Sequence, residues 1–125
     1  MVVGAMMRIA HIGLIVSDLE RSALFYERIL GLKRIERPDL AFDGIWFGLK
    51  DGQQIHLMLL DDPYSEREKP AHGGRDNHVA LQTDDYECIR QRLEAAHITL
   101  TTSKSGRAAL FCRDPDGNTI ELINV

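Results

Sequence analysis

The sequence lacks the features that mark several classes of protein. It has two cysteines in 125 residues, in no recognisable motif, so we expect free thiols and a cytoplasmic protein. No apolar run approaches the roughly 18 residues of a membrane helix, and residues 1–7 lack the basic segment that opens a signal peptide. Only 6% of the residues are aromatic, so we expect no surface on which nucleic-acid bases could stack. The net charge of −4 also predicts no basic surface for nucleic acid.

What the chain does contain is the composition of an ordinary globular domain. Hydrophobic residues make up 44% of the sequence and charged residues 27%. A chain of this length can bury a core without disulfides or metal ions to hold it together. We therefore expect one domain over residues 1–125.

An internal repeat is the main feature of the sequence. The stretch HIGLIVSDL at 11–19 aligns with HVALQTDDY at 78–86, at an offset of 67 residues. The stretch DGQQIHL at 51–57 aligns with DGNTIEL at 116–122, at the nearly equal offset of 65 residues. Two matches at nearly one offset predict two similar modules, at 8–60 and 75–125, with the Pro- and Gly-containing segment 61–74 as a linker.

Each module shows the same order of predicted elements. An apolar strand is followed by an amphipathic helix and then by strands that are paired through an Asp-Gly turn. The strands are expected over 9–16, 44–49 and 54–60 and over 79–83, 108–113 and 119–123, and the helices over 19–30 and 85–96. Each module is predicted to fold as β-α-β-β-β, of which these patterns locate the helix and three of the four strands, and the fold is therefore α+β.

Four side chains of metal-ligand type share the strand faces that lie opposite the aliphatic stripes. Side chains alternate along a strand, so the aliphatic residues should pack on the helices and leave the other face free. A lone histidine in a strand is more often a surface residue than a ligand, but these four occupy two pairs of repeat-equivalent positions. If both sheets curve into one concave surface, they converge on a site for zinc, nickel, cobalt or iron. They are His11, His56, His78 and Glu121.

On its motifs the chain resembles the vicinal oxygen chelate superfamily, which includes glyoxalase I, methylmalonyl-CoA epimerase, fosfomycin-resistance thiol transferases, extradiol dioxygenases and bleomycin-resistance proteins. The motifs are HIGLIVSDL from His11, FY at 25–26, LG at 30–31, NHVA at 77–80 and RDPDGNTIEL at 113–122. FDGIW at 42–46, IHLM at 55–58, HGGRD at 72–76 and SKSGR at 103–107 are similar to small glyoxalase I-like proteins of plants and bacteria. The resemblance implies paired β-α-β-β-β modules in a curved, barrel-like mixed sheet with the helices outside, and a homodimer.

The resemblance also implies an activity. It indicates a lyase or isomerase that uses one divalent ion (Zn, Ni, Co, Mn or Fe), held by His11, His56, His78 and Glu121, to stabilise an enediolate. The substrate would be a 2-oxoaldehyde adduct or an α-oxo or hydroxy acid derivative, and a thiol cosubstrate such as glutathione is compatible with it. Glu121 would also act as the base. Glyoxalase I commonly has Glu where this chain has His56, so a single carboxylate remains for proton transfer.

Several residues are candidates for substrate binding. Four cations of the second module could clamp an anionic group, although each taken singly is more often a solvated surface charge. They are Arg75, Lys104, Arg107 and Arg113. Arg113 could instead pair with Asp114 or Asp116, and Trp46 could line the pocket or pack in the core.

Two other functions stay open at this point. One is a non-catalytic protein that sequesters a hydrophobic or anionic small molecule. The other is an Fe(II)-dependent ring-cleaving dioxygenase with His11, His78 and Glu121 as a facial triad. Ile15 stands where glutathione-dependent glyoxalase I often has Arg, which weakens that specific activity.

Overall fold

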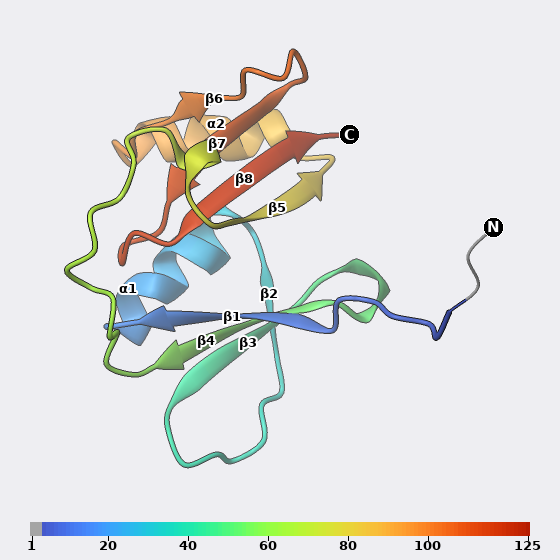
Figure 1. The fold of residues 1–125 in the computed structure, drawn as a ribbon, viewed down its shortest axis with the longest axis vertical. Coiled ribbons are helices and arrows are strands. Elements are labelled where there is room, and N and C mark those ends of the chain that lie inside the picture. Colours follow the sequence, from blue (N-terminus) through green and yellow to red (C-terminus); the bar gives the residue numbers. More distant parts are fainter. Residues whose placement is uncertain (1–3) are drawn as a thin grey trace.

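Two four-stranded mixed sheets, one from each half of the sequence, form the frame of the computed structural model, which describes residues 4–125. Residues 1–3 lie outside the described range. They belong to the segment 1–7, which the sequence does not identify as a signal peptide. Sheet A has the strand order β1-β4-β3-β2 and sheet B the order β5-β8-β7-β6 (Figure 1). The strands are β1 (His11–Val16), β2 (Lys33–Ile35), β3 (Gly44–Gly48), β4 (Gln54–Leu59), β5 (His78–Thr83), β6 (Thr101–Thr102), β7 (Ala109–Arg113) and β8 (Thr119–Asn124).

The two sheets have the same internal topology. β1 is parallel to β4, β5 is parallel to β8, and the remaining neighbours in each sheet are antiparallel. With one helix after the first strand of each sheet, this is the paired β-α-β-β-β fold that the repeat predicts. The sequence did not locate β2 and β6, because strands of three and two residues are too short to show an alternating pattern.

The first helix differs from its prediction. One α-helix was expected over 19–30, but α1 (Leu19–Ala23) passes into a π-helical segment, η1 (Leu24–Ile29). The amide of Leu30 donates to the carbonyl of Phe25, five residues back, at 3.0 Å. This wider turn accompanies the full burial of two consecutive aromatic side chains, Phe25 and Tyr26. The second helix, α2 (Tyr86–Ala95), lies within its predicted range, and no helix in residues 4–125 is long and apolar enough to cross a membrane.

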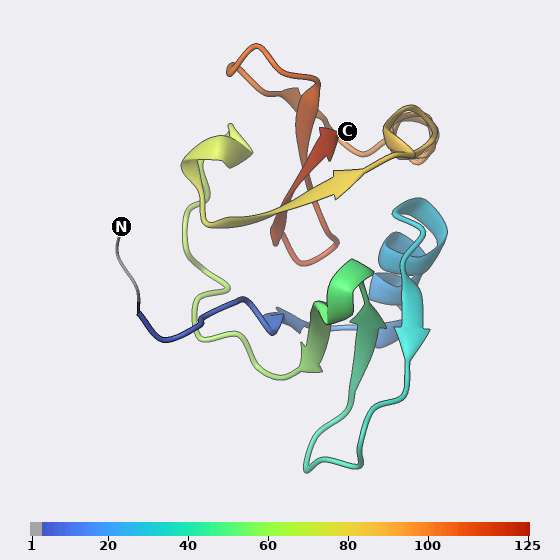
Figure 2. The ribbon, with the colours of Figure 1, turned by 90° about the vertical axis from the view of Figure 1, so that its right-hand side faces the viewer.

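The hydrophobic core is shared by both halves of the chain. Ile55 and Leu57 of β4 and Ile120 and Leu122 of β8 are buried, which confirms the predicted aliphatic stripes. Figure 2 shows the two helices next to one another between the ends of the two sheets, where α2 packs against η1. Because the aliphatic faces of the sheets are turned to this core, the faces that carry the histidines are turned away from it.

Candidate metal centre

The first part of the candidate site is a stack of three rings on sheet A. His11 and His56 lie with their ring centroids 4.1 Å apart and their planes 16° from parallel. Trp46 covers the other side of His56 at 3.9 Å, with its plane nearly parallel. Trp46 and His56 are directly opposite each other on β3 and β4, and His11 begins β1 on the other side of β4. Strand pairing therefore brings together three residues that are far apart in the sequence.

The environment of His56 favours a neutral imidazole. Burial, together with the nearby charges of His11 and Arg37, lowers the pKa of His56 below its usual value. Its Nε2 lies 2.7 Å from Oε1 of Gln54, two residues earlier on the same face of β4. A neutral ring that a neighbour holds in one orientation is the form that can ligate a metal ion.

The second part of the site is an acid–imidazole pair on sheet B. Nε2 of His78 lies 3.3 Å from Oε1 of Glu121, and the Glu121 side chain is only 5% exposed. Nδ1 of His78 lies 2.7 Å from the carbonyl oxygen of Asp76, so this nitrogen donates the proton and Nε2 faces the carboxylate. Phe111 packs edge-on to the His78 ring at 5.2 Å. The ring is thus held with its Nε2 beside a buried acid.

The structure does not bring the two pairs together within one chain. Among the described residues, no three His, Cys, Asp or Glu side chains are close enough to hold one metal ion. In donor chemistry the set fits a divalent transition metal, since imidazole and carboxylate are its usual ligands. In arrangement, each sheet supplies half of such a site: His11 with His56, and His78 with Glu121.

The predicted substrate-binding cations lie in three kinds of environment. Arg107 contacts the site directly, with its guanidinium 3.2 Å from Oε2 of Glu121. Arg75 and Lys104 are exposed and form no ion pair within residues 4–125. Arg113 donates to Asp76, Gly117, Thr119 and Pro70 and is part of a structural network. The assignment of Arg113 to substrate stays untested, and these contacts favour a structural role.

The carboxylate at the centre of that network, Asp76, should contribute measurably to stability. The hydrogen bond from Arg113, with a second from Arg67, lowers the pKa of Asp76 from 3.8 to about 2. This shift stabilises the folded state above the unfolded-state pKa, and the effect is lost as the pH falls towards 2. We expect Asp76→Asn to lower the free energy of unfolding at pH 7 by about 2 kcal/mol in urea titrations. Glu68→Gln, a substitution of an exposed carboxylate, is the control. Equal stability of the two variants would contradict the assigned role.

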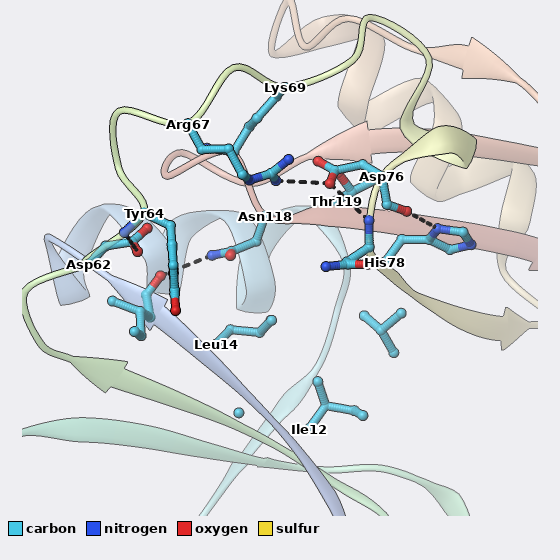
Figure 3. Close-up of a pocket in the computed structure, with 15 residues that line it drawn as sticks. Ile12, Leu14, Asp62, Tyr64, Arg67, Lys69, Asp76, His78, Asn118 and Thr119 are labelled. Carbon is cyan, nitrogen blue, oxygen red and sulfur yellow. Dashed lines mark hydrogen bonds and ion pairs between the residues drawn. The ribbon is translucent and has the colours of Figure 1, made fainter.

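A cavity of about 600 Å³ lies between β1 and β5 and is closed on one side by the linker (Figure 3). Ile12 and Leu14 give it an apolar wall, and its charged lining holds Lys69 and Asp62 and the ion pair of Arg67 with Asp76. Of the four candidate ligands only His78 lines it. The cavity is therefore adjacent to the sheet B pair rather than centred on the four ligands.

Sequence reasoning did not identify two further residues that surround the candidate ligands. Gln54 holds His56 by a hydrogen bond, and its position two residues earlier on the same strand was a signal that could have identified it. His72 of the linker packs edge-on to Phe111 at 5.2 Å, on the ring that also contacts His78. No sequence pattern predicts the second contact, because it depends on how the linker folds back over sheet B.

The fold and these paired strand positions define a class of proteins built from two β-α-β-β-β modules, with polar groups on the sheet faces turned away from the core. The profile of the Glyoxalase/Bleomycin resistance protein/Dioxygenase superfamily matches residues 8–122. The chain belongs to this superfamily.

Known relatives cover most of the chain. A protein of Arabidopsis thaliana named Glyoxylase I 4 is 31% identical over 91% of this chain and 68% of its own length. A lactoylglutathione lyase of Haemophilus influenzae is 31% identical over 94% of this chain and 92% of its own length. A fosfomycin resistance protein of Listeria monocytogenes, solved with Mn(II) and dihydroxypropylphosphonic acid, shares the fold with a TM-score of 0.74 and 20% identity. The match covers 96% of this chain and 93% of that protein.

Proposed function

We propose that the protein is a metal-dependent lyase or isomerase of the glyoxalase I type. The observation that carries the proposal is the pairing of ligand-type side chains on equivalent strands, His11 with His56 on sheet A and His78 with Glu121 on sheet B. Relatives named lactoylglutathione lyase support the reaction class. The proposed substrate is an adduct of a 2-oxoaldehyde, or a related α-oxo or hydroxy acid derivative, with glutathione as a candidate thiol cosubstrate.

We further propose that the active protein is a homodimer whose sites lie between two copies. The two ligand pairs lie on separate sheets, and each pair is on a face turned away from the core of its own chain. Two-fold symmetry would set the sheet A pair of one copy against the sheet B pair of the other, twice per dimer. Each site would then have three imidazoles and one carboxylate.

In this site Glu121 carries the proton transfer. A divalent ion bound there would act as a Lewis acid on two neighbouring substrate oxygens. Glu121 is the only carboxylate among the four, so its side chain would accept the proton from the substrate carbon and return it to the adjacent carbon. Arg107, in contact with Oε2 of Glu121, would balance the negative charge of the carboxylate. The buried position of Glu121 keeps bulk water away from the proton in transit.

Metal analysis tests this function. Protein purified without a histidine tag should contain about one divalent ion per chain by elemental mass spectrometry, as expected for a site with four protein ligands. It should also consume the adduct of methylglyoxal and glutathione. His11→Ala should lose both the metal and the activity, with metal affinity reduced by more than about 100-fold. His97→Ala, which removes a histidine outside the four, is the control and should keep both.

The cavity between β1 and β5 favours a second candidate function, the binding of a small molecule without turnover. Its apolar wall suits a hydrophobic ligand, and Lys69 of the linker could contact an anionic group on it. Metal-free protein that takes up no nickel, zinc, cobalt, manganese or iron would support this binding role against the lyase. If the bound metal is iron, oxygen uptake with a catechol would instead indicate a dioxygenase.

A further inference from the structure

Arg37 is a partly buried cation on the loop between β2 and β3. One terminal nitrogen of its guanidinium donates to the carbonyl oxygen of Phe42 at 2.6 Å. The guanidinium carbon lies 5.2 Å from the centre of the Phe42 ring. These two contacts, both within one loop, hold the cation in a defined place.

The hydrogen-bonding capacity of this guanidinium is largely unused. Its Nε is buried and has no acceptor in the described part of the chain. The same loop holds three exposed carboxylates, and none forms an ion pair with Arg37. They are Glu36, Asp39 and Asp43. The second terminal nitrogen of the guanidinium forms no hydrogen bond within the described residues, and a cation that avoids nearby acids is available through this nitrogen to an anion from outside the chain.

The position of Arg37 connects it to the ring stack on sheet A. A Cβ on Gly44 would come within 3.2 Å of two guanidinium nitrogens, so the cation lies over the bare backbone of this glycine. On the same sheet, Met58, the register partner of Gly44, lies against Gly13 of β1. Gly44 precedes Trp46 by two residues on one strand face, which is about 7 Å. Arg37 is thus one step along the sheet from the stacked imidazoles.

We propose that Arg37 binds an oxyanion, a carboxylate or a phosphate, that the substrate carries beside its reacting atoms. A guanidinium presents parallel N–H groups that match two oxygens of such a group. The identification of the anion as part of a substrate rests on the proposed function, but binding of the anion itself requires no metal. Arg37 is therefore a specificity-determining residue that would orient the substrate against the sheet A imidazoles.

The test is an anion titration of the metal-free protein. Chelator-treated protein labelled with ¹⁵N is titrated with sodium lactate in one series and potassium phosphate in another, at ionic strength held constant with sodium chloride. The Nε–H resonance of Arg37, assigned by its absence in Arg37→Gln, should shift and saturate with at least one of the two anions. The anion that saturates it distinguishes a carboxylate from a phosphate. Fluorescence of Trp46, the only tryptophan in the chain, is a second readout of the same face.

The variants give the proposal its controls. Arg37→Gln should weaken anion binding about tenfold or more, and Arg37→Lys, which keeps the charge without the fork, should weaken it less. Arg34→Gln is the matched control, because Arg34 lies on β2 and already pairs with Glu27. This variant should bind the anion as tightly as the wild type does. No saturable shift with either anion, or equal binding by Arg37→Gln, overturns the proposal. Because the protein is free of metal, either result is independent of whether the lyase activity exists.

Discussion

Mixing His11→Ala chains with Glu121→Gln chains is expected to restore about a quarter of the wild-type activity, although each variant alone has almost none. In the proposed dimer a site takes His11 and His56 from one copy and His78 and Glu121 from the other. A mixed dimer then has one site with both substitutions and one site with neither. Random exchange makes about half of the dimers mixed, and half of their sites are intact. Activity is measured after the chains are refolded together.

A third protein provides the control for this experiment. A chain with both substitutions, mixed with His11→Ala chains, lacks His11 in every site and should remain inactive. If the sites instead lie within single chains, the first mixture would also stay inactive, because each site would carry one substitution. A monomer by light scattering with full activity would likewise contradict a site between two copies.

Replacing Asp114 with alanine is expected to lower the free energy of unfolding by about 3 kcal/mol. The buried carboxylate accepts from the Tyr26 hydroxyl at 2.7 Å and from the Asn118 side chain at 2.9 Å. It also accepts from the backbone amides of Asp116 and Asn118. The substitution would leave these donors without a partner near the core. Urea titration gives the change directly.

Tyr26→Phe is the matched comparison, because it removes only one of those donors. It should cost about 1 kcal/mol. Burial raises the pKa of Asp114, so the folded state holds this proton more tightly than the unfolded chain does. The contribution of Asp114 to the free energy of unfolding therefore falls as the pH rises above about 4, the pKa of this side chain in the unfolded chain. Asp114→Asn should abolish this pH dependence. An unfolding midpoint that is unchanged in Asp114→Ala would show that the network does not support the fold.

Local patterns in the sequence were sufficient to predict most of the strands. The repeat located the two modules and placed His11 and His56 at positions equivalent to His78 and Glu121. The strict alternation of side chains along a strand then assigned these residues to the face opposite the aliphatic stripe, and the aliphatic residues of β4 and β8 lie in the hydrophobic core. Both predictions depend only on neighbours along the chain and on the pleat of a strand.

Other features depend on contacts between distant segments. The π-helical turn at 24–29 accompanies the burial of Phe25 and Tyr26, and Tyr26 is held by Asp114 from the other half of the chain. The structural network around Arg113 involves Asp76, thirty-seven residues earlier. The sequence offered Arg113 as a substrate-binding candidate or as a partner of Asp114 or Asp116. Arg37 was not identified, because its significance lies in the bare backbone of Gly44 beneath it.

The sequence by itself determined which side chains lie on each strand face, because that choice follows from a period of two residues. Only the tertiary structure decided where those faces are placed relative to each other. The helices of the two halves pack together in a shared core, and this packing sets sheet A and sheet B apart as two separate four-stranded sheets. As a result, the four candidate ligands form two pairs in one chain instead of a single cluster. That outcome depends on the fit of side chains such as Leu93 and Phe25 in the core, which no local pattern records.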